Sequence, residues 1–169
     1  MIKKYELLRD GINYYNLEVD KKKFIITNSP TNKNISGYLK ELKYNNTNII
    51  VRFGEKRYDE DLVKDIDFVD LYIEDGSIPN EETINIFLNI IRKNDVIAVH
   101  CISGLGRAPM MVVIAMILEY GMKEIDSIVK MRQTIPNSLN TKQINFLKND
   151  LKKIKKSRCC MIIRNCTIM

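Results

Sequence analysis

The feature that most constrains the fold is a buried strand, a glycine-containing loop and a buried helix in direct succession over residues 96–120. Residues 96–99 are apolar at every position, which is typical of a central strand covered on both faces. Residues 108–120 are almost all apolar, and Pro109 would fall in the first turn of a helix, where a missing amide hydrogen costs little. This succession predicts a sheet with helices on both sides.

The remainder of the chain alternates between strand and helix patterns. Short runs rich in β-branched residues occur at residues 24–27, 49–53 and 68–73. Apolar residues recur at helical spacing in residues 35–42, 84–91 and 125–132. The alternation predicts an α/β fold with a mostly parallel sheet of four or five strands. We expect one domain over residues 1–150 and a tail over residues 151–169.

The charge and the cysteines are unevenly distributed. The formal net charge is +6, and the excess of basic residues lies entirely after residue 147. The neutral body disfavours a nucleic-acid-binding surface. Cys101 is the only cysteine before residue 159, so no disulfide framework is expected. With no signal-peptide pattern and no apolar run near the roughly 20 residues of a membrane span, we expect a cytosolic chain with peripheral membrane contact at most.

The loop between the buried strand and the buried helix carries the candidate chemistry. Residues 100–107 read His-Cys-Ile-Ser-Gly-Leu-Gly-Arg. A loop that enters a helix N-terminus presents unpaired amide hydrogens and partial positive charge, and such a place binds an oxyanion. Glycines let the backbone curl around a phosphoryl group. The predicted phosphate-binding residues are Ile102, Ser103, Gly104, Leu105, Gly106 and Arg107.

Cys101 is the candidate nucleophile at the mouth of this positive cradle. The cradle favours the thiolate, which is the form of cysteine that attacks phosphorus. The planar guanidinium of Arg107 can hold two phosphoryl oxygens in a bidentate clamp, which a lysine could not imitate. The alternative is a buried cysteine with a purely structural role. His100, the only histidine, is expected to shape the loop rather than to transfer protons.

A proton donor is also required, because the leaving oxygen must be protonated when a phosphocysteine forms. The candidate is Asp75, in a loop after a predicted strand, where Gly76 permits a movable turn. Glu74 is the alternative, and the local sequence alone favours a solvated acidic turn. The pattern implies no cofactor and no metal.

With these residues identified, the chain resembles the phosphatases of regenerating liver (PRL), the prenylated branch of the dual-specificity and protein tyrosine phosphatases. The matching stretches are residues 24–32, 51–52, 74–76, 98–109, 121–122, 140–143 and 166–169. The resemblance implies a three-layer cysteine-phosphatase fold, with Cys101 as nucleophile, Arg107 as phosphate clamp and Asp75 as general acid. Ala108 stands where most relatives have a hydroxyl that helps expel the thiolate, which implies slow breakdown of the phosphocysteine.

The chain departs from this family at two places. The family usually carries a second cysteine that bonds reversibly to the nucleophile, but Gly54 stands there, so we expect that redox switch to be absent. The family's acid loop usually reads Trp-Pro-Phe before its acids, whereas residues 71–73 are Leu-Tyr-Ile. The family pattern therefore does not predict how this loop closes here.

The sequence leaves the substrate and the partners open. A phosphoprotein and a phosphoinositide are both candidate substrates, and the uncharged side chains of Ile102, Ser103 and Leu105 favour the phosphoprotein. The resemblance also implies binding to the CBS-pair domains of magnesium transporters, so the alternative function is a membrane-tethered binding module. A homo-oligomer is a further candidate assembly. A thiol redox protein lacks a partner cysteine.

The end of the chain fits a lipid anchor. Residues 166–169 form a prenylation box with Cys166 as acceptor, and the terminal methionine favours farnesyl. The basic residues of the tail would supply the second membrane signal, and Cys159 and Cys160 could carry palmitoyl groups. We expect location at the cytoplasmic face of the plasma membrane or endomembranes, with a cytosolic pool. The alternative is a solvated basic end with unmodified thiols.

Overall fold

The computed structural model describes residues 4–5, for the backbone only, and residues 11–154. The strands are β1 (Lys4–Tyr5), β2 (Tyr14–Val19), β3 (Lys22–Asn28), β4 (Ile49–Arg52), β5 (Asp67–Asp70) and β6 (Val96–Cys101). The helices are α1 (Ile35–Tyr44), the 3-10 turn η1 (Glu60–Val63), α2 (Glu81–Lys93), α3 (Arg107–Leu118), α4 (Glu124–Thr134), α5 (Thr141–Asn145) and the π-helical turn η2 (Phe146–Asp150).

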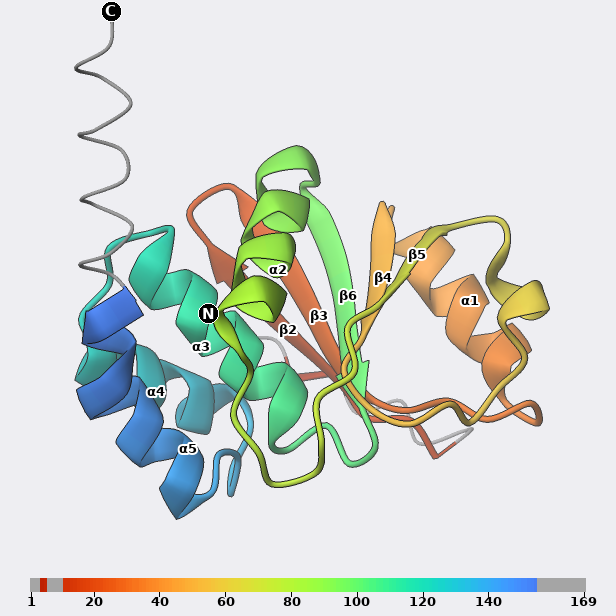
Figure 1. Cartoon of the computed structure of the whole chain (residues 1–169). Helices are drawn as coiled ribbons and strands as arrows, with labels where there is room; N and C mark the ends of the chain where they lie inside the picture. The colour runs from red at the N-terminus through yellow and green to blue at the C-terminus, as the bar shows by residue number, and fades with distance from the viewer. Residues whose placement is uncertain (1–3, 6–10, 155–169) are drawn as a thin grey trace, which may run out of the picture.

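The strands form one six-stranded sheet in the order β1-β2-β3-β6-β4-β5. The neighbours β3, β6, β4 and β5 are parallel, and the short β1 and β2 join the edge as antiparallel strands. Figure 1 shows α1 and η1 on one face of the sheet and α2 to α5 on the other. The predicted three-layer α/β class is confirmed. The carboxyl ends of the parallel strands meet at one edge, where sheets of this type place their sites.

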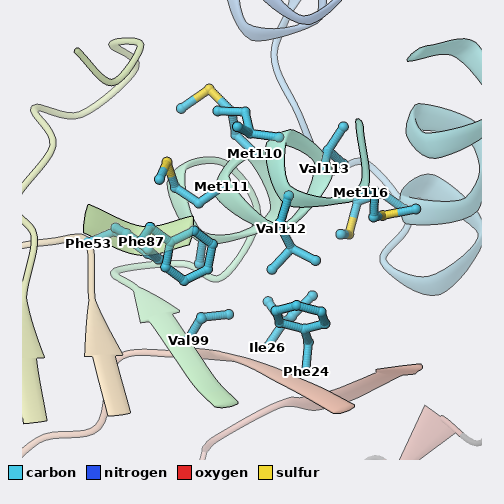
Figure 2. Close-up of a cluster of buried hydrophobic side chains, with 14 of the residues drawn as sticks. Phe24, Ile26, Phe53, Phe87, Val99, Met110, Met111, Val112, Val113 and Met116 are labelled. Atoms are coloured by element: carbon cyan, nitrogen blue, oxygen red, sulfur yellow. The ribbon is translucent and has the colours of Figure 1, made fainter. Parts of the chain in front are cut away.

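The larger part of the core lies between the sheet and α3. Every residue of α3 except Leu118 is buried, because the helix has apolar side chains on all sides and is enclosed by the sheet and the neighbouring helices. Figure 2 shows Val112 facing the sheet residues Phe24, Ile26 and Val99. A second, smaller cluster fills the space between the sheet and α1. The two clusters hold β6, and therefore the loop that follows it, rigidly in the middle layer.

The elements agree with the predictions from the sequence, apart from the ends of the chain. The four predicted strands and the four predicted helices are all present. The hairpin strand β2 was not predicted, although Asn16 and Glu18 alternate with apolar residues as in a half-buried strand. The helical turns continue to Ile154, and Leu151 is still buried in the main core. Within the described residues, no helix is both long and apolar enough to cross a membrane.

Candidate active site

The predicted phosphate loop joins the end of β6 to the first turn of α3. Cys101 is the last residue of β6 and Arg107 is the first residue of α3. Gly104 has a φ of +74°, and a side-chain carbon there would lie 2.9 Å from the backbone of Thr27. Only glycine fits this position without strain. Gly106 brings no capping side chain to α3, so the first amides of the helix are available to an anion.

The other loop residues use their backbone for support. The Ile102 carbonyl accepts a hydrogen bond from the Ser29 amide (3.1 Å). The Ser103 hydroxyl accepts one from the Leu105 amide (3.3 Å), and the Leu105 side chain is exposed. The loop is therefore tied to the segment after β3, while its only charged side chain is that of Arg107 at its end.

The segment after α4 forms a wall against the loop. The Leu139 amide donates to the Leu105 carbonyl (2.8 Å). Arg132 in turn donates from Nη2 to the Leu139 carbonyl (3.1 Å). Gln143 lies so close to Gly106 that a side-chain carbon on Gly106 would be 3.3 Å from its Nε2. A side chain at position 106 would thus push against this wall.

Arg107 is the centre of the polar contacts in the site. Its side chain is 3% exposed. Nη1 donates to both carboxylate oxygens of Glu55 (3.1 and 3.0 Å) and to the carbonyl of Ile73 (3.0 Å). Nη2 forms an ion pair with Asp75 Oδ1 at 3.2 Å. Nε is buried and has no partner within the described residues, so it remains available to a ligand in the cradle.

These contacts offset the burial of the arginine. Burial alone would lower the pKa of Arg107, but the hydrogen bond with Glu55 and the negative charges of Cys101, Glu55 and Asp75 outweigh burial and raise the pKa. The hydrogen bond from Arg107 lowers the pKa of Glu55 in return. Cys101 itself is 1% exposed.

Of the two candidate acids, the structure brings Asp75 to Arg107. Its side chain is 84% exposed apart from that contact. Glu74 instead accepts a hydrogen bond from the Ser77 hydroxyl (3.4 Å). Gly76 lies in the turn between Glu74 and Ser77. It has a φ of +69° and open space around it.

The acid loop is anchored without the Trp-Pro-Phe of the resembling family. The Leu71 amide donates to the Arg52 carbonyl (2.8 Å), and the Ile73 amide donates to the Phe53 carbonyl (3.2 Å). Ile73 is buried in the main core, whereas Tyr72 points to solvent. The alternating in-and-out pattern of an extended segment thus fixes the start of the loop.

His100 lies under the loop on the opposite face of the sheet from Cys101. It is fully buried, and its Nε2 is 2.8 Å from the Tyr58 hydroxyl. Burial first, and then the positive charge of Arg52, lower the pKa of His100 to about 3. The imidazole is therefore neutral at physiological pH, which fits the predicted role in shaping the loop.

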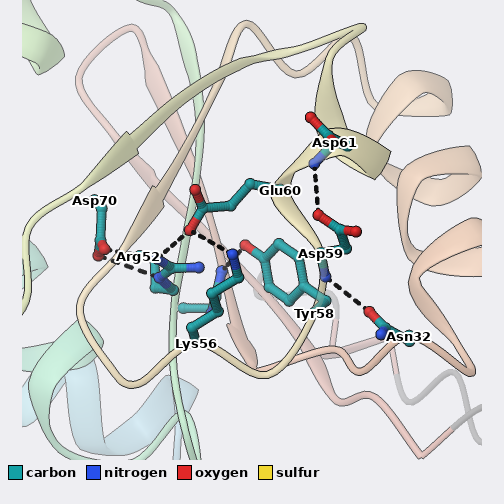
Figure 3. A network of polar contacts seen from close by, with 9 residues as sticks. Asn32, Arg52, Lys56, Tyr58, Asp59, Glu60, Asp61 and Asp70 are labelled. Atoms are coloured by element: carbon teal, nitrogen blue, oxygen red, sulfur yellow. Dashed lines mark hydrogen bonds and ion pairs between the residues drawn. The ribbon is translucent and has the colours of Figure 1, made fainter.

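Arg52 organises a buried polar network next to this histidine (Figure 3). Its Nε and Nη2 donate to the two carboxylate oxygens of Asp70 (3.1 and 2.6 Å), and Nη2 also donates to Glu60 (2.6 Å). The guanidinium stacks over the rings of Tyr58 and Phe68 at 5.7 and 5.1 Å. Burial removes water from the positive charge of Arg52, which is unfavourable. The carboxylates and the aromatic rings around the guanidinium compensate for this loss.

The sequence analysis missed Glu55, Tyr58 and Arg52 as parts of the site. Arg52 had a detectable signal, because it is a charged residue inside an otherwise apolar strand pattern. Its register partners are His100 on β6 and Asp70 on β5. Glu55 and Tyr58 gave no such signal, since they lie in an irregular loop whose path only the folded chain defines.

Gly54 lies directly against Cys101, the predicted nucleophile. A side-chain carbon there would be 3.3 Å from Cys101 Cα and 3.1 Å from the amide nitrogen of Ile102. This is the position at which the resembling family has its second cysteine. Within the described part of the chain, Cys101 is a free thiol.

The other predicted residues are placed as follows. Ala108 is fully buried in the first turn of α3. Cys159, Cys160 and Cys166 lie outside the described residues. Among the described residues, no cluster of histidine, cysteine and acidic side chains is suited to hold a metal ion.

Comparison with known proteins gives consistent relatives. A family described as the DSP-PTPase phosphatase of polymorphic toxin systems matches residues 27–122. Human protein tyrosine phosphatase type IVA 3 is 34% identical over 157 residues, covering 83% of this chain and 90% of the human one. The Drosophila melanogaster PRL-1 phosphatase is 35% identical over 133 residues, covering 74% and 75% of the two chains.

Solved structures show the same fold. A candidate protein tyrosine phosphatase from Leishmania major superposes with a TM-score of 0.74 at 25% identity, covering 81% of this chain and 98% of that one. The kinase-associated phosphatase also gives a TM-score of 0.74, at 18% identity, with 86% and 97% covered. Together with the Cys101–Arg107 loop, these likenesses show that the chain belongs to the type IVA, or PRL, family of protein tyrosine phosphatases.

Proposed function

We propose that this phosphatase cleaves phosphate monoesters through a phosphocysteine on Cys101. The observation that carries the proposal is the position of Arg107, which begins α3 at the end of the loop that starts at Cys101 and forms an ion pair with Asp75 at 3.2 Å. Two segments that are distant in sequence, the loop from Cys101 to Arg107 and the loop that carries Asp75, thus supply the proposed nucleophile, clamp and acid. An arrangement of this kind is expected of two-step phosphoryl transfer.

In the first step, the Cys101 thiolate attacks phosphorus, so that an S–P bond forms and the P–O bond to the leaving group breaks. Asp75 in its neutral form gives its proton to the leaving oxygen. Phosphoryl oxygens would bind to the free Nε of Arg107, and to Nη2 once Asp75 leaves it. In the second step, Asp75 takes a proton from water, the water oxygen attacks phosphorus, and phosphate and the thiolate are released.

The second step is expected to be slow. Ala108 provides no hydroxyl to stabilise the departing thiolate, and it is fully buried against the loop. A phosphocysteine should therefore accumulate, which predicts a burst of leaving group followed by slow turnover.

Single-turnover kinetics on two aryl phosphates test this mechanism. Cys101→Ser should abolish the burst. Asp75→Asn should slow the burst by about 100-fold with phenyl phosphate but far less with p-nitrophenyl phosphate, whose leaving group needs little protonation. A burst that survives in Cys101→Ser would contradict the role of the nucleophile. Equal slowing with both substrates would contradict the role of Asp75.

We propose a phosphoprotein rather than a phosphoinositide as substrate. Ile102, Ser103 and Leu105 bring no charge to the loop, whereas a multiply phosphorylated headgroup would need more cations inside the pocket. Comparing kcat/KM for a phosphotyrosine peptide and a short-chain phosphoinositide tests this choice. A higher value for the phosphoinositide would reverse it.

A second candidate function is that of a binding module. Two carboxylates, those of Glu55 and Asp75, already contact Arg107, so the guanidinium accepts carboxylates as well as phosphate. This favours capture of an acidic side chain from a CBS-pair-domain magnesium transporter in the same pocket. Submicromolar binding of a transporter fragment, together with no turnover of any aryl phosphate, would support the binding module over the enzyme mechanism.

For the end of the chain, we propose a farnesyl group on Cys166 and association with cytoplasmic membrane faces, with Cys159 and Cys160 as candidate palmitoylation sites. We place the domain boundary a few residues beyond the predicted residue 150, because Leu151 is buried. Mass spectrometry of the native protein should show a farnesyl adduct on Cys166 and loss of the last three residues. Light scattering of the same sample tests the homo-oligomer.

A further inference from the structure

A polar hollow lies on the segments next to the phosphate loop. It has a volume of about 410 Å³ and is lined by Asn32, Lys56, Arg57, Tyr58 and Asp59. Its walls are the segments that follow β3 and β4, the two strands that flank β6. The hollow therefore lies at the same edge of the sheet as the phosphate loop. Figure 3 labels four of these lining residues, Asn32, Lys56, Tyr58 and Asp59.

The segment that carries Lys56 and Arg57 is fixed to the active site at both ends. Before them, Glu55 holds Nη1 of Arg107. After them, the Tyr58 hydroxyl contacts His100 at 2.8 Å. The two cations are therefore held at a defined offset from the reacting phosphoryl group, and their side chains are exposed.

Both cations are available to a ligand. Lys56 has one ion pair, to Glu60 at 3.8 Å, and its side chain is 58% exposed. Glu60 is already bound more closely by Arg52, at 2.6 Å. Arg57 has no hydrogen bond or ion pair within residues 11–154.

One acid lines the hollow against these two cations. The Asp59 carboxylate accepts a hydrogen bond from the Asp61 amide (3.1 Å), where it caps η1. The side chains that line the hollow therefore carry more positive than negative charge.

We infer that Lys56 and Arg57 form an accessory anion subsite that selects phosphopeptides with a second acidic group near the phosphorylated residue. The second group is a carboxylate or another phosphoryl group on the same peptide. The inference rests on the proposed phosphatase function. The catalytic loop supplies no charge of its own beyond Arg107, so discrimination between substrates falls to the residues around it. The exposed apolar side chains of Tyr72, Ile78 and Leu105 on the neighbouring loops suit peptide side chains rather than a lipid headgroup.

Three phosphotyrosine peptides of one sequence test the subsite, with glutamine, glutamate or phosphoserine at the flanking positions. The selectivity is the ratio of kcat/KM for each acidic peptide to that for the glutamine peptide. In the wild type we expect a ratio of about five, mostly through KM and decreasing with added salt, as two exposed charge contacts would give. In Lys56→Ala/Arg57→Ala the ratio should fall to about one.

Lys40→Ala/Lys93→Ala is the matched control. It removes the same charge from α1 and from the end of α2, away from the carboxyl edge of the sheet, so it should keep the wild-type ratio. Lys56→Glu/Arg57→Glu should reverse the selectivity and favour a peptide with lysine flanks. The glutamate peptide and the phosphoserine peptide are each compared with the glutamine peptide. A preference for either acidic peptide supports the subsite.

The inference is overturned if the wild type shows no selectivity, if the control loses it equally, or if Lys56→Ala/Arg57→Ala impairs only a phosphoinositide substrate. Its failure is distinguishable from that of the proposed function. A wild type that does not turn over p-nitrophenyl phosphate would refute the phosphatase mechanism alone, and the subsite would then be judged by the Kd values of the peptides. Equal Kd values would refute the subsite as well.

Discussion

At the scale of single residues, the site depends on which groups surround two buried side chains. The pKa of Arg107 is raised, because the hydrogen bond with Glu55 and the nearby negative charges outweigh its burial. His100 has no acid beside it and becomes neutral. The same physical cost, the desolvation of a charge, is therefore resolved in opposite ways within one strand–loop–helix unit.

The buried histidine predicts a loss of stability in acid. The ordinary pKa of histidine is 6.5, and that of folded His100 is about 3. Between these values the unfolded chain binds a proton that the folded chain does not, so the free energy of unfolding falls as the pH falls. From pH 7 to pH 5, wild type should lose about 2 kcal/mol more than His100→Gln in urea denaturation. An identical loss in both proteins would contradict this prediction.

A hydroxyl in place of Ala108 should change the second step alone. Ala108→Ser introduces a donor at the first turn of α3, next to the departing thiolate. Steady-state turnover of an aryl phosphate should increase by about tenfold, while the rate of the burst stays the same. Burying the hydroxyl should also cost about 1 kcal/mol of stability. If steady-state turnover does not change, the breakdown of the phosphocysteine is limited by something other than this missing hydroxyl.

At the scale of elements, the phosphate loop is held by its neighbours more than by its own sequence. The segment after β3 supports it through Ser29, and the segment after α4 supports it through Leu139. The loop after β4 reaches it through Glu55. These supports explain why a loop that contains two glycines is rigid enough to preorganise an anion site.

Two glycine substitutions separate backbone strain from close packing. Gly104 and Gly121 have φ values of +74° and +65°, but a side-chain carbon has open space only at Gly121. Gly121→Ala should cost about 1–2 kcal/mol from its backbone conformation alone. Gly104→Ala should cost clearly more in urea denaturation and should abolish the burst, because the new carbon would collide with the backbone at Thr27. Equal losses of stability in the two variants would show that the backbone at Thr27 can move away from the new carbon without a cost in free energy.

At the scale of the whole molecule, the proposed active site and the net positive charge lie in different parts of the chain. Residues 1–147 have no net charge, and the basic excess follows them. We therefore expect attraction to an anionic surface to come from the end of the chain rather than from the part that carries the proposed active site.

This separation predicts a salt-sensitive membrane interaction without any lipid modification. The unmodified chain should bind vesicles with phosphatidylserine, and replacing the lysines at 152, 153, 155 and 156 by glutamine should weaken binding by about 1 kcal/mol per residue near the surface. Raising the salt concentration should have a similar effect. Binding that persists in the glutamine variant would locate the contact on the folded body.

The local sequence was sufficient to predict the strand, the phosphate loop and the buried helix, because their patterns are continuous in the chain. It also made Cys101 and Arg107 the candidate nucleophile and clamp, whereas the preference for Asp75 over a solvated acidic turn came from the resemblance to the PRL phosphatases. The tertiary structure decided what a chain pattern cannot encode: that Asp75 and not Glu74 meets Arg107, that Glu55 shares this arginine, and that Tyr58 supports His100. These contacts depend on parallel strands meeting at one edge, where residues far apart in sequence become adjacent.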